Sequence, residues 1–168
     1  MRFTRTSTGI YFAPNSIVVG DVKLGENTSI WFNAVIRGDV APVVLGRRVN
    51  VQDGVVIHCD TGVQNVIGND VSIGHCAILH GMSVGDGTLI GMSATLLGRT
   101  QIGKECLIAA GAVVVPDTKI PDRHLVAGVP AKIIRPLKDE DFKYIQWLTN
   151  HYVELAQKYI AGEFDPAP

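Results

Sequence analysis

The sequence predicts an all-β protein, a parallel β-helix of short strands, followed by one α-helix near the C-terminal end. Two patterns lead to this prediction: apolar residues recur every six positions through most of the chain, and the spacing becomes helical near the end. A six-residue period fits neither the 3.6-residue turn of an α-helix nor the two-residue alternation of a single strand. Short strands joined by turns and stacked into coils do produce it.

The repeat occupies nineteen positions, all of them aliphatic or aromatic. They are Phe12, Val18, Leu24, Ile30, Ile36, Leu45, Val51, Ile57, Ile67, Ile73, Leu79, Val84, Ile90, Leu96, Ile102, Ile108, Val114, Ile120 and Val126. We expect each of these side chains to point into a shared core. Glycine follows several of them, and it permits the sharp turns that such coils need.

Two steps of the repeat are longer than six residues, one over 36–45 and one over 57–67. We expect both to form loops that project from the coils. The pattern as a whole resembles the hexapeptide-repeat family, whose fold is a left-handed triangular prism with three repeats to a coil. This resemblance implies about six coils, and a prism roughly 29 Å tall at about 4.8 Å between stacked strands.

The segment AGVPAKIIRPL, which follows the last repeat, contains Pro130 and Pro136. We expect it to leave the prism, because proline cannot donate to a regular hydrogen-bond ladder. From about 139 to 161 the apolar spacing is helical, with acidic residues at the start and Gly162 at the end. This helix is expected to pack along a prism face.

The chain therefore divides into a β-helix domain at 1–136 and a C-terminal helix with its tail at 137–168. The last five residues, FDPAP, are expected to be a frayed tail.

Composition excludes several classes of protein. The formal net charge is −1 and there is no basic cluster, so nucleic acid and anionic membrane surfaces are not expected partners. No apolar run reaches the length of about 18 residues that a membrane span requires. The first residues lack the apolar core of a secretory signal. The three cysteines form no CxxC pair, and we expect small buried thiols in a cytoplasmic protein.

Three histidines become significant once the repeats are placed on the prism. Repeats three apart lie above one another, and the residues after the fifth, eighth and eleventh repeats are Arg37, His58 and His80. These form one column, with neighbours about 4.8 Å apart at Cα. His75 belongs to a different column, which also holds Asp53. His58 and His80 can therefore converge on one metal ion, and His75 joins them most simply from another subunit of a homotrimer.

A single histidine on a strand is more often a surface or hydrogen-bonded residue than a ligand. The stacking of His58 with His80 favours the metal interpretation, since no acidic or aromatic repeat explains it. Three imidazoles with an open fourth position are the arrangement of catalytic zinc, whose bound water reaches a pKa near 7. Zn²⁺ is the expected metal, and Fe²⁺ or Co²⁺ could occupy the same site.

Three segments of the chain, IRGDV, NVQDGVVIH and GHCAILHG, resemble the γ-class carbonic anhydrase family. The resemblance implies that His58, His75 and His80 are the metal ligands, with His75 supplied by the adjacent subunit. It implies a zinc hydroxide that hydrates carbon dioxide to bicarbonate at the interfaces of a homotrimer.

The same resemblance assigns roles to other residues. Arg37 and Asp39 would pair across the trimer interface, and Gln52 would orient the zinc-bound hydroxide. Tyr152, together with Asn150, would reach the site from the C-terminal helix. In addition, we predict from the prism register that Trp31 and Phe32 pack between subunits.

One departure from the family bears on activity. The glutamates that shuttle protons are missing, because Val40 follows the RGD segment and the loop at 59–66 contains no glutamate. The chain thus resembles the shorter subgroup, also called ferripyochelin-binding protein-like. A slow hydrase is one expectation. The alternatives are a coenzyme A thioester acyltransferase or thioesterase on the same fold, and a metal-binding scaffold without catalysis.

Overall fold

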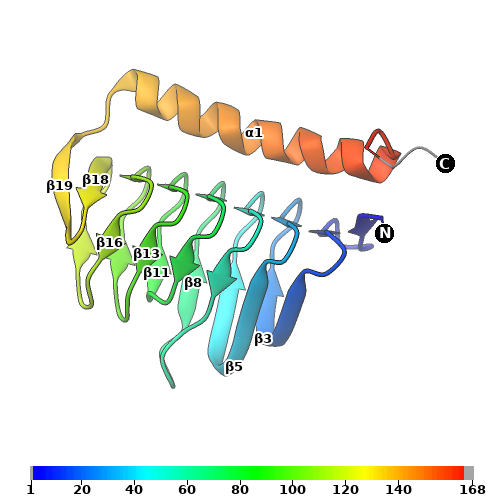
Figure 1. Ribbon diagram of the computed structural model, residues 1–168, viewed down its shortest axis with the longest axis horizontal. Coiled ribbons are helices and arrows are strands. Elements are labelled where there is room, and N and C mark those ends of the chain that lie inside the picture. The colour runs from blue at the N-terminus through cyan, green and yellow to red at the C-terminus, as the bar shows by residue number, and fades with distance from the viewer. Residues whose placement is uncertain (1, 165–168) are drawn as a thin grey trace.

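The computed structural model describes residues 2–164, which form a β-helix of about six turns and one long helix (Figure 1). The elements are β1 (Thr4–Arg5), β2 (Tyr11–Phe12), β3 (Ile17–Leu24), β4 (Ser29–Ile30), β5 (Val35–Leu45), β6 (Asn50–Val51), β7 (Val56–Ile57), β8 (Asn65–Ile67), β9 (Ser72–Ile73), β10 (Ile78–Leu79), β11 (Ser83–Val84), β12 (Leu89–Ile90), β13 (Thr95–Leu96), β14 (Gln101–Ile102), β15 (Leu107–Ile108), β16 (Val113–Val114), β17 (Lys119–Ile120), β18 (His124–Gly128), β19 (Ala131–Pro136) and α1 (Asp139–Ala161). The predicted fold class is confirmed: an all-β, left-handed parallel β-helix with a C-terminal helix packed on it.

Strands three repeats apart pair in parallel, so the prism has three faces. Face 1 contains β2, β4, β6, β9, β12, β15 and β18; face 2 contains the first halves of β3 and β5, then β7, β10, β13 and β16; face 3 contains the second halves of β3 and β5, then β8, β11, β14 and β17. Ile57 lies between Ile36 and Leu79 in the ladder of face 2, as the repeat register predicted.

The repeat residues form one continuous core along the prism axis. Most of them are fully buried, and Phe12, Val18 and Leu24 of the first coils are partly buried against the same core. Two of the cysteines, Cys59 and Cys106, are buried as predicted, whereas Cys76 is exposed on a turn.

The prediction of a projecting loop at 36–45 is wrong. β5 runs without interruption through this segment and pairs with β3 on both sides of a register shift between Gly20 and Val22. The extra residues are accommodated as a bulge, because Val43 and Leu45 return to the buried core of face 3. The second long step does form a loop, which leaves the prism between β7 and β8 (Figure 1).

The segment after the last repeat was expected to form no ladder, and this expectation is also wrong. β19 pairs antiparallel with β18, so the last coil ends in a hairpin. Proline is tolerated there because β19 is the edge strand of its sheet, with Pro130 in the turn and Pro136 at the strand's end.

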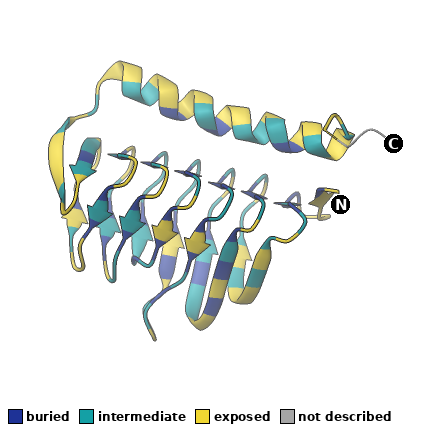
Figure 2. Ribbon diagram, viewed as in Figure 1, coloured by how far each residue is buried: buried dark blue, intermediate teal, exposed yellow. Residues whose placement is uncertain are grey.

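The C-terminal helix α1 has the predicted bounds. The Asp141 carboxylate accepts a hydrogen bond of 2.7 Å from the backbone N–H of Lys138 at its start, and Gly162 ends it in the left-handed region, with φ of 82°. α1 packs over β4, β6 and β9 on face 1 and runs back toward the N-terminus (Figure 1). Its inner side is the buried one (Figure 2).

The position of α1 corrects the prediction for Trp31. Trp31 is only 3% exposed and packs with Phe3, Tyr11 and Ala156 beneath the helix, and Phe32 packs against the same cluster. Trp31 is therefore buried within one chain, whereas Phe32 stays half-buried and its contact with another subunit stays a prediction. The sequence could not reveal this, because helical spacing does not say which face the helix covers.

The division at residue 136 stays a prediction, and residues 165–168 of the predicted tail lie outside the described residues. In the part of the chain that the structure describes, no helix has the length and apolar character to cross a membrane.

Candidate metal centre

Two of the three predicted ligands lie together in one chain. His58 and His80 follow β7 and β10, which are hydrogen-bonded neighbours on face 2, so both side chains leave the corner between faces 2 and 3. Their ring centroids are 5.2 Å apart, with an angle of 66° between the ring planes. The ladder of a parallel β-helix therefore produces the predicted pair directly.

The third histidine lies on another corner, between faces 1 and 2. Nδ1 of His75 is 2.8 Å from Oδ2 of Asp53, its neighbour in the coil before. Among residues 2–164 of a single chain, no three His, Cys, Asp or Glu side chains are grouped so as to hold a metal ion. The register predicted His75 in a different column from His58 and His80, and it lies there. The sharing of His75 between subunits stays a prediction.

The chemistry of these side chains fits a metal bound by nitrogen. The carboxylate of Asp53 accepts from Nδ1–H of His75 when that tautomer is present, so Nε2 is the nitrogen with a lone pair. The hydroxyl of Tyr152 lies 3.4 Å from this Nε2 and would have to give up that contact to a metal ion. Asp60 stands in a similar relation to His80, with Oδ1 3.0 Å from Nε2. Carboxylate partners of this kind fix ring orientation in metal sites. His58, His75 and His80 thus fit the ligand set of Zn²⁺.

His58 has a partner at each ring nitrogen. Nε2 lies 3.0 Å from Oδ1 of Asp39, and Nδ1 lies 3.3 Å from an Arg37 nitrogen. Arg37 and Asp39 also form an ion pair of 2.6 Å within the chain. The Arg37 hydrogen bond holds the pKa of the Asp39 carboxyl below its usual range. Metal binding by His58 requires one of these partners to turn away. Pairing of Arg37 with Asp39 across subunits stays a prediction.

Gln52 is buried beside His75. Its Oε1 accepts a hydrogen bond of 3.2 Å from the backbone N–H of His75, and its Nε2 donates to Oδ1 of Asn50 at 3.0 Å. Asn50 donates to Oγ of Ser72, which lies 3.2 Å from Oγ1 of Thr149 on α1. A chain of buried polar groups therefore connects Gln52 to the helix.

Sequence reasoning missed Asn50, Ser72 and Thr149. The sequence did contain a signal, because Asn50 and Ser72 are polar residues at outward positions of strands on one face. When another element covers that face, these buried polar side chains need a hydrogen-bond partner from it. Thr149 supplies that partner from α1.

Tyr152 on α1 lies beside His75, and its role in the site stays a prediction. Its hydroxyl lies 3.4 Å from Nε2 of His75. Burial raises the pKa of Tyr152 to about 12, and the charge of Asp53 acts in the same direction. Asn150 does not reach the site. Its Oδ1 instead accepts a hydrogen bond of 2.6 Å from Arg48.

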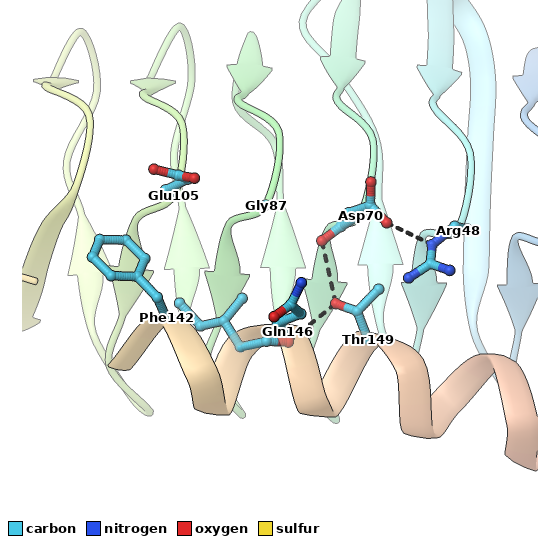
Figure 3. Close-up of a pocket in the computed structure, with 8 residues that line it drawn as sticks. Arg48, Asp70, Gly87, Glu105, Phe142, Gln146 and Thr149 are labelled. Carbon is cyan, nitrogen blue, oxygen red and sulfur yellow. Dashed lines mark hydrogen bonds and ion pairs between the residues drawn. The ribbon is translucent and has the colours of Figure 1, made fainter. Parts of the chain in front are cut away.

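A separate hollow of about 340 Å³ lies between α1 and the third corner of the prism, where faces 3 and 1 meet (Figure 3). Arg48 and Asp70 line its upper side and are paired at 2.6 Å, while Thr149 donates to the backbone oxygen of Asp70. None of the three candidate ligands lines it. The contact of Thr149 with Asp70 holds α1, the helix that carries Tyr152, against the prism.

Comparison with known proteins identifies the relatives of this fold and site. The family described as "Bacterial transferase hexapeptide (six repeats)" matches residues 81–116. A carbonic anhydrase of Geobacillus kaustophilus is 44% identical over 151 residues, which cover 90% of this chain and 83% of that protein. The mitochondrial γ carbonic anhydrase 2 of Arabidopsis thaliana is 38% identical over 88% of this chain. The chain spans only 55% of that plant protein's length.

Among solved structures, a Bacillus cereus protein provisionally named an acetyltransferase superposes with a TM-score of 0.88 at 41% identity. The match covers 92% of this chain and 89% of that one. Fold and sequence thus define a hexapeptide-repeat protein. Within that family, the chain belongs to the γ-carbonic-anhydrase-like group.

Proposed function

We propose that this protein is a γ-class carbonic anhydrase, which hydrates carbon dioxide to bicarbonate at a metal ion held between copies of the chain. The observation that carries the proposal is the placement of the three histidines. His58 and His80 form a pair on one corner, and His75 stands on another with its Nδ1 facing Asp53. Membership of a family whose relatives include proteins named carbonic anhydrase supports the same activity.

In this proposal, His58 and His80 of one copy and His75 of the next hold Zn²⁺, and Fe²⁺ or Co²⁺ suits the same donors. The bound metal supplies one element of chemistry, a lowered pKa of coordinated water. Asp53 orients the ring of His75. Gln52 keeps one amide N–H beyond its bond to Asn50, and this N–H is the group that can orient a reacting oxygen.

Tyr152 has a distinct role in the proposal. Because its pKa is about 12, the hydroxyl stays protonated at neutral pH and can donate a hydrogen bond beside His75. The proposed assembly is a homotrimer with three equivalent metal centres. We place it in the cytoplasm, where its three unpaired cysteines would remain reduced.

The test is to purify the protein without oxygen and to measure both metal content and the rate of carbon dioxide hydration by stopped flow. We expect one metal ion per chain and a hydration rate above the uncatalysed one. His58→Ala, His75→Ala and His80→Ala should each remove both. His124→Ala is the matched control, because His124 belongs to β18 and its Nδ1 lies 2.8 Å from the backbone oxygen of Asp122.

Metal-loaded protein without hydration would contradict the proposal. In that case the name of the Bacillus cereus structure makes acyl chemistry on a coenzyme A thioester the second candidate. Turnover of acetyl-coenzyme A with and without an amine acceptor distinguishes an acyltransferase from a thioesterase. Metal binding without either activity would indicate a metal-binding scaffold.

A further inference from the structure

An apolar pocket lies between α1 and face 1, beside the corner that carries His75. Its volume is about 250 Å³, and it shares no lining residue with the polar hollow of Figure 3. Leu89 and Leu107, at outward positions of β12 and β15, line its prism side, and Leu148 lines its helix side. None of its described lining residues carries a formal charge. The pocket therefore suits an apolar group.

The pocket exists because face 1 changes in character along the prism. In the lower coils its outward residues are polar, and Ser72 lies within hydrogen-bond distance of α1. Leu89 follows directly above Ser72 in the ladder, and Leu107 follows above Leu89. Two glycines of the neighbouring turns, Gly74 and Gly91, also line the pocket and bring no side chain into it. The upper coils thus leave an apolar space beneath the helix.

One end of the pocket is polar and lies beside His75. Gln52 lines this end, is 2% exposed, and accepts at Oε1 from the backbone N–H of His75. One of its two amide N–H groups donates to Asn50, and the other has no acceptor among the described residues. Tyr152 also lines the pocket, and its hydroxyl is 3.4 Å from Nε2 of His75. That distance exceeds the usual range of about 2.7–3.2 Å, so the hydroxyl can turn to a nearer acceptor. Two donors are therefore available to one acceptor oxygen.

The pocket is larger than carbon dioxide requires. A dry apolar cavity of about 150 Å³ is already large enough to bind benzene. At about 250 Å³, this pocket has room for a short aliphatic chain together with a carbonyl group.

The charges around the pocket favour a neutral ligand. The Asp53 carboxylate lies 2.8 Å from Nδ1 of His75, and none of the described residues that line the pocket is a cation. An ionised carboxylate would therefore enter without a counter-charge, which is costly away from water. A neutral carbonyl oxygen meets the two donors without this cost.

We propose that the apolar pocket binds a neutral carbonyl compound with a short aliphatic chain, such as the acyl part of an ester or an amide. The chain lies among Leu89, Leu107 and Leu148. The carbonyl oxygen accepts from the free N–H of Gln52 and from the Tyr152 hydroxyl, which places the carbonyl group beside the His75 corner. This binding goes beyond the hydration of carbon dioxide, since that substrate has no chain to fill the pocket. It does not depend on a bound metal.

The test compares the binding of hexanamide, butyramide and hexanoate to the full chain by isothermal titration calorimetry. Excess EDTA is present, so that no carboxylate binds through a metal ion. Each methylene that enters an apolar site strengthens binding by roughly fourfold. Hexanamide should therefore bind more than about 5-fold tighter than butyramide, its homologue with the shorter chain. Hexanoate should bind at least about 10-fold more weakly than hexanamide, because it carries a charge. Equal affinity of the two amides overturns the proposal, as does hexanoate binding as tightly as hexanamide.

Leu107 and Leu125 offer a matched pair of variants. Both are half-buried leucines at outward positions of face 1 in neighbouring coils, but of the two only Leu107 lines the pocket. Leu107→Phe should weaken hexanamide binding by more than about 5-fold, because the larger ring takes the place of the chain. Leu125→Phe should leave it unchanged. Far-UV circular dichroism checks that each variant is folded, and Leu148→Phe replaces Leu107→Phe if the latter is not. Equal effects of the two variants would overturn the proposal.

Tyr152→Phe tests the polar end of the pocket. Loss of one hydrogen bond should weaken the binding of both amides by about 2–12-fold and leave their ratio as in wild type. Unchanged affinities would contradict the placement of the carbonyl oxygen.

The outcome is separable from that of the proposed function. Amide binding by a protein that shows no hydration after metal loading would contradict the carbonic anhydrase proposal and leave the pocket as a binding site. Hydration by a protein that does not prefer hexanamide would do the reverse.

Discussion

The hydroxyl of Tyr152 lies 3.4 Å from Nε2 of His75, although 77 residues separate the two in the chain. Burial of this phenol gives a first prediction. Its pKa is about 12 in the folded protein and about 10 when unfolded, so the unfolded chain releases the proton first as pH rises. The preference of the folded state for the protonated phenol therefore contributes fully to the free energy of unfolding below pH 10. This contribution should be lost as the pH rises from 10 to 12. Urea unfolding at a series of pH values measures it.

In Tyr152→Phe the fall between pH 10 and 12 should be smaller than in wild type. Tyr144→Phe is the control, since it removes a hydroxyl from an exposed ring of the same helix. Identical pH profiles for wild type and Tyr152→Phe would show that the Tyr152 phenol does not titrate as its burial predicts.

The second prediction concerns the sharing of the metal centre. His75→Ala and His80→Ala chains should each bind no metal alone. In trimers that contain both kinds of chain, one of the three interfaces pairs an intact His75 with an intact His58–His80 pair. Mixing by unfolding and refolding together should therefore restore part of the metal content, measured by atomic emission on the repurified trimer. Mixed trimers free of metal would mean that all ligands come from one chain.

The third prediction concerns the attachment of α1. Oγ1 of Thr149 donates to a backbone oxygen of the prism and lies within 3.2 Å of Oγ of Ser72. Thr149→Val leaves these buried groups without that partner, and unsatisfied buried groups cost about 1–3 kcal/mol each. Urea unfolding should show a loss of this size. Thr61→Val, on the exposed loop, should change the stability little. A neutral Thr149→Val would mean that apolar packing alone holds the helix.

The fourth prediction concerns proton transfer in the proposed hydrase. Without a glutamate after Asp39 or in the 59–66 loop, release of the proton should limit the rate, since positioned acid–base groups contribute about 10²–10⁴-fold. Hydration should therefore accelerate with imidazole concentration. Val40→Glu should weaken that dependence if the new carboxylate reaches the site, and Val40→Gln is the uncharged control. A wild-type rate that is fast and indifferent to buffer would show that another residue already carries the proton.

Much of this fold could be predicted because a parallel β-helix couples sequence distance to spatial distance. Once three repeats make a coil, Ile36, Ile57 and Leu79 have to be neighbours in one ladder. His58 and His80, which follow the last two, are then neighbours as well. The bounds of α1 were predictable for a local reason: acidic residues favour the start of a helix, and Gly162 adopts the left-handed conformation that ends it.

The remaining features depend on contacts that the repeat does not encode. The place of Trp31 depends on the face that α1 covers, and the bulge of β5 depends on a ladder partner, β3, earlier in the chain. The partners of Gln52 likewise come from strands and a helix far apart in sequence. In each case the deciding neighbour is distant in the chain and outside the six-residue register.

The return of α1 across face 1 has a consequence for how the chain comes apart. In a solenoid each coil touches only the next, so an end coil can unravel while the rest stays intact. Here Tyr159, near the end of α1, packs against Phe3 with ring centroids 4.7 Å apart and ring planes tilted by 33°. The last element of the chain thus contacts the first residues. Unfolding that begins at the N-terminal end must first break the contacts of the first residues with α1, the helix that places Tyr152 beside His75. Unfolding of the first coil and loss of the candidate metal centre should therefore be one event.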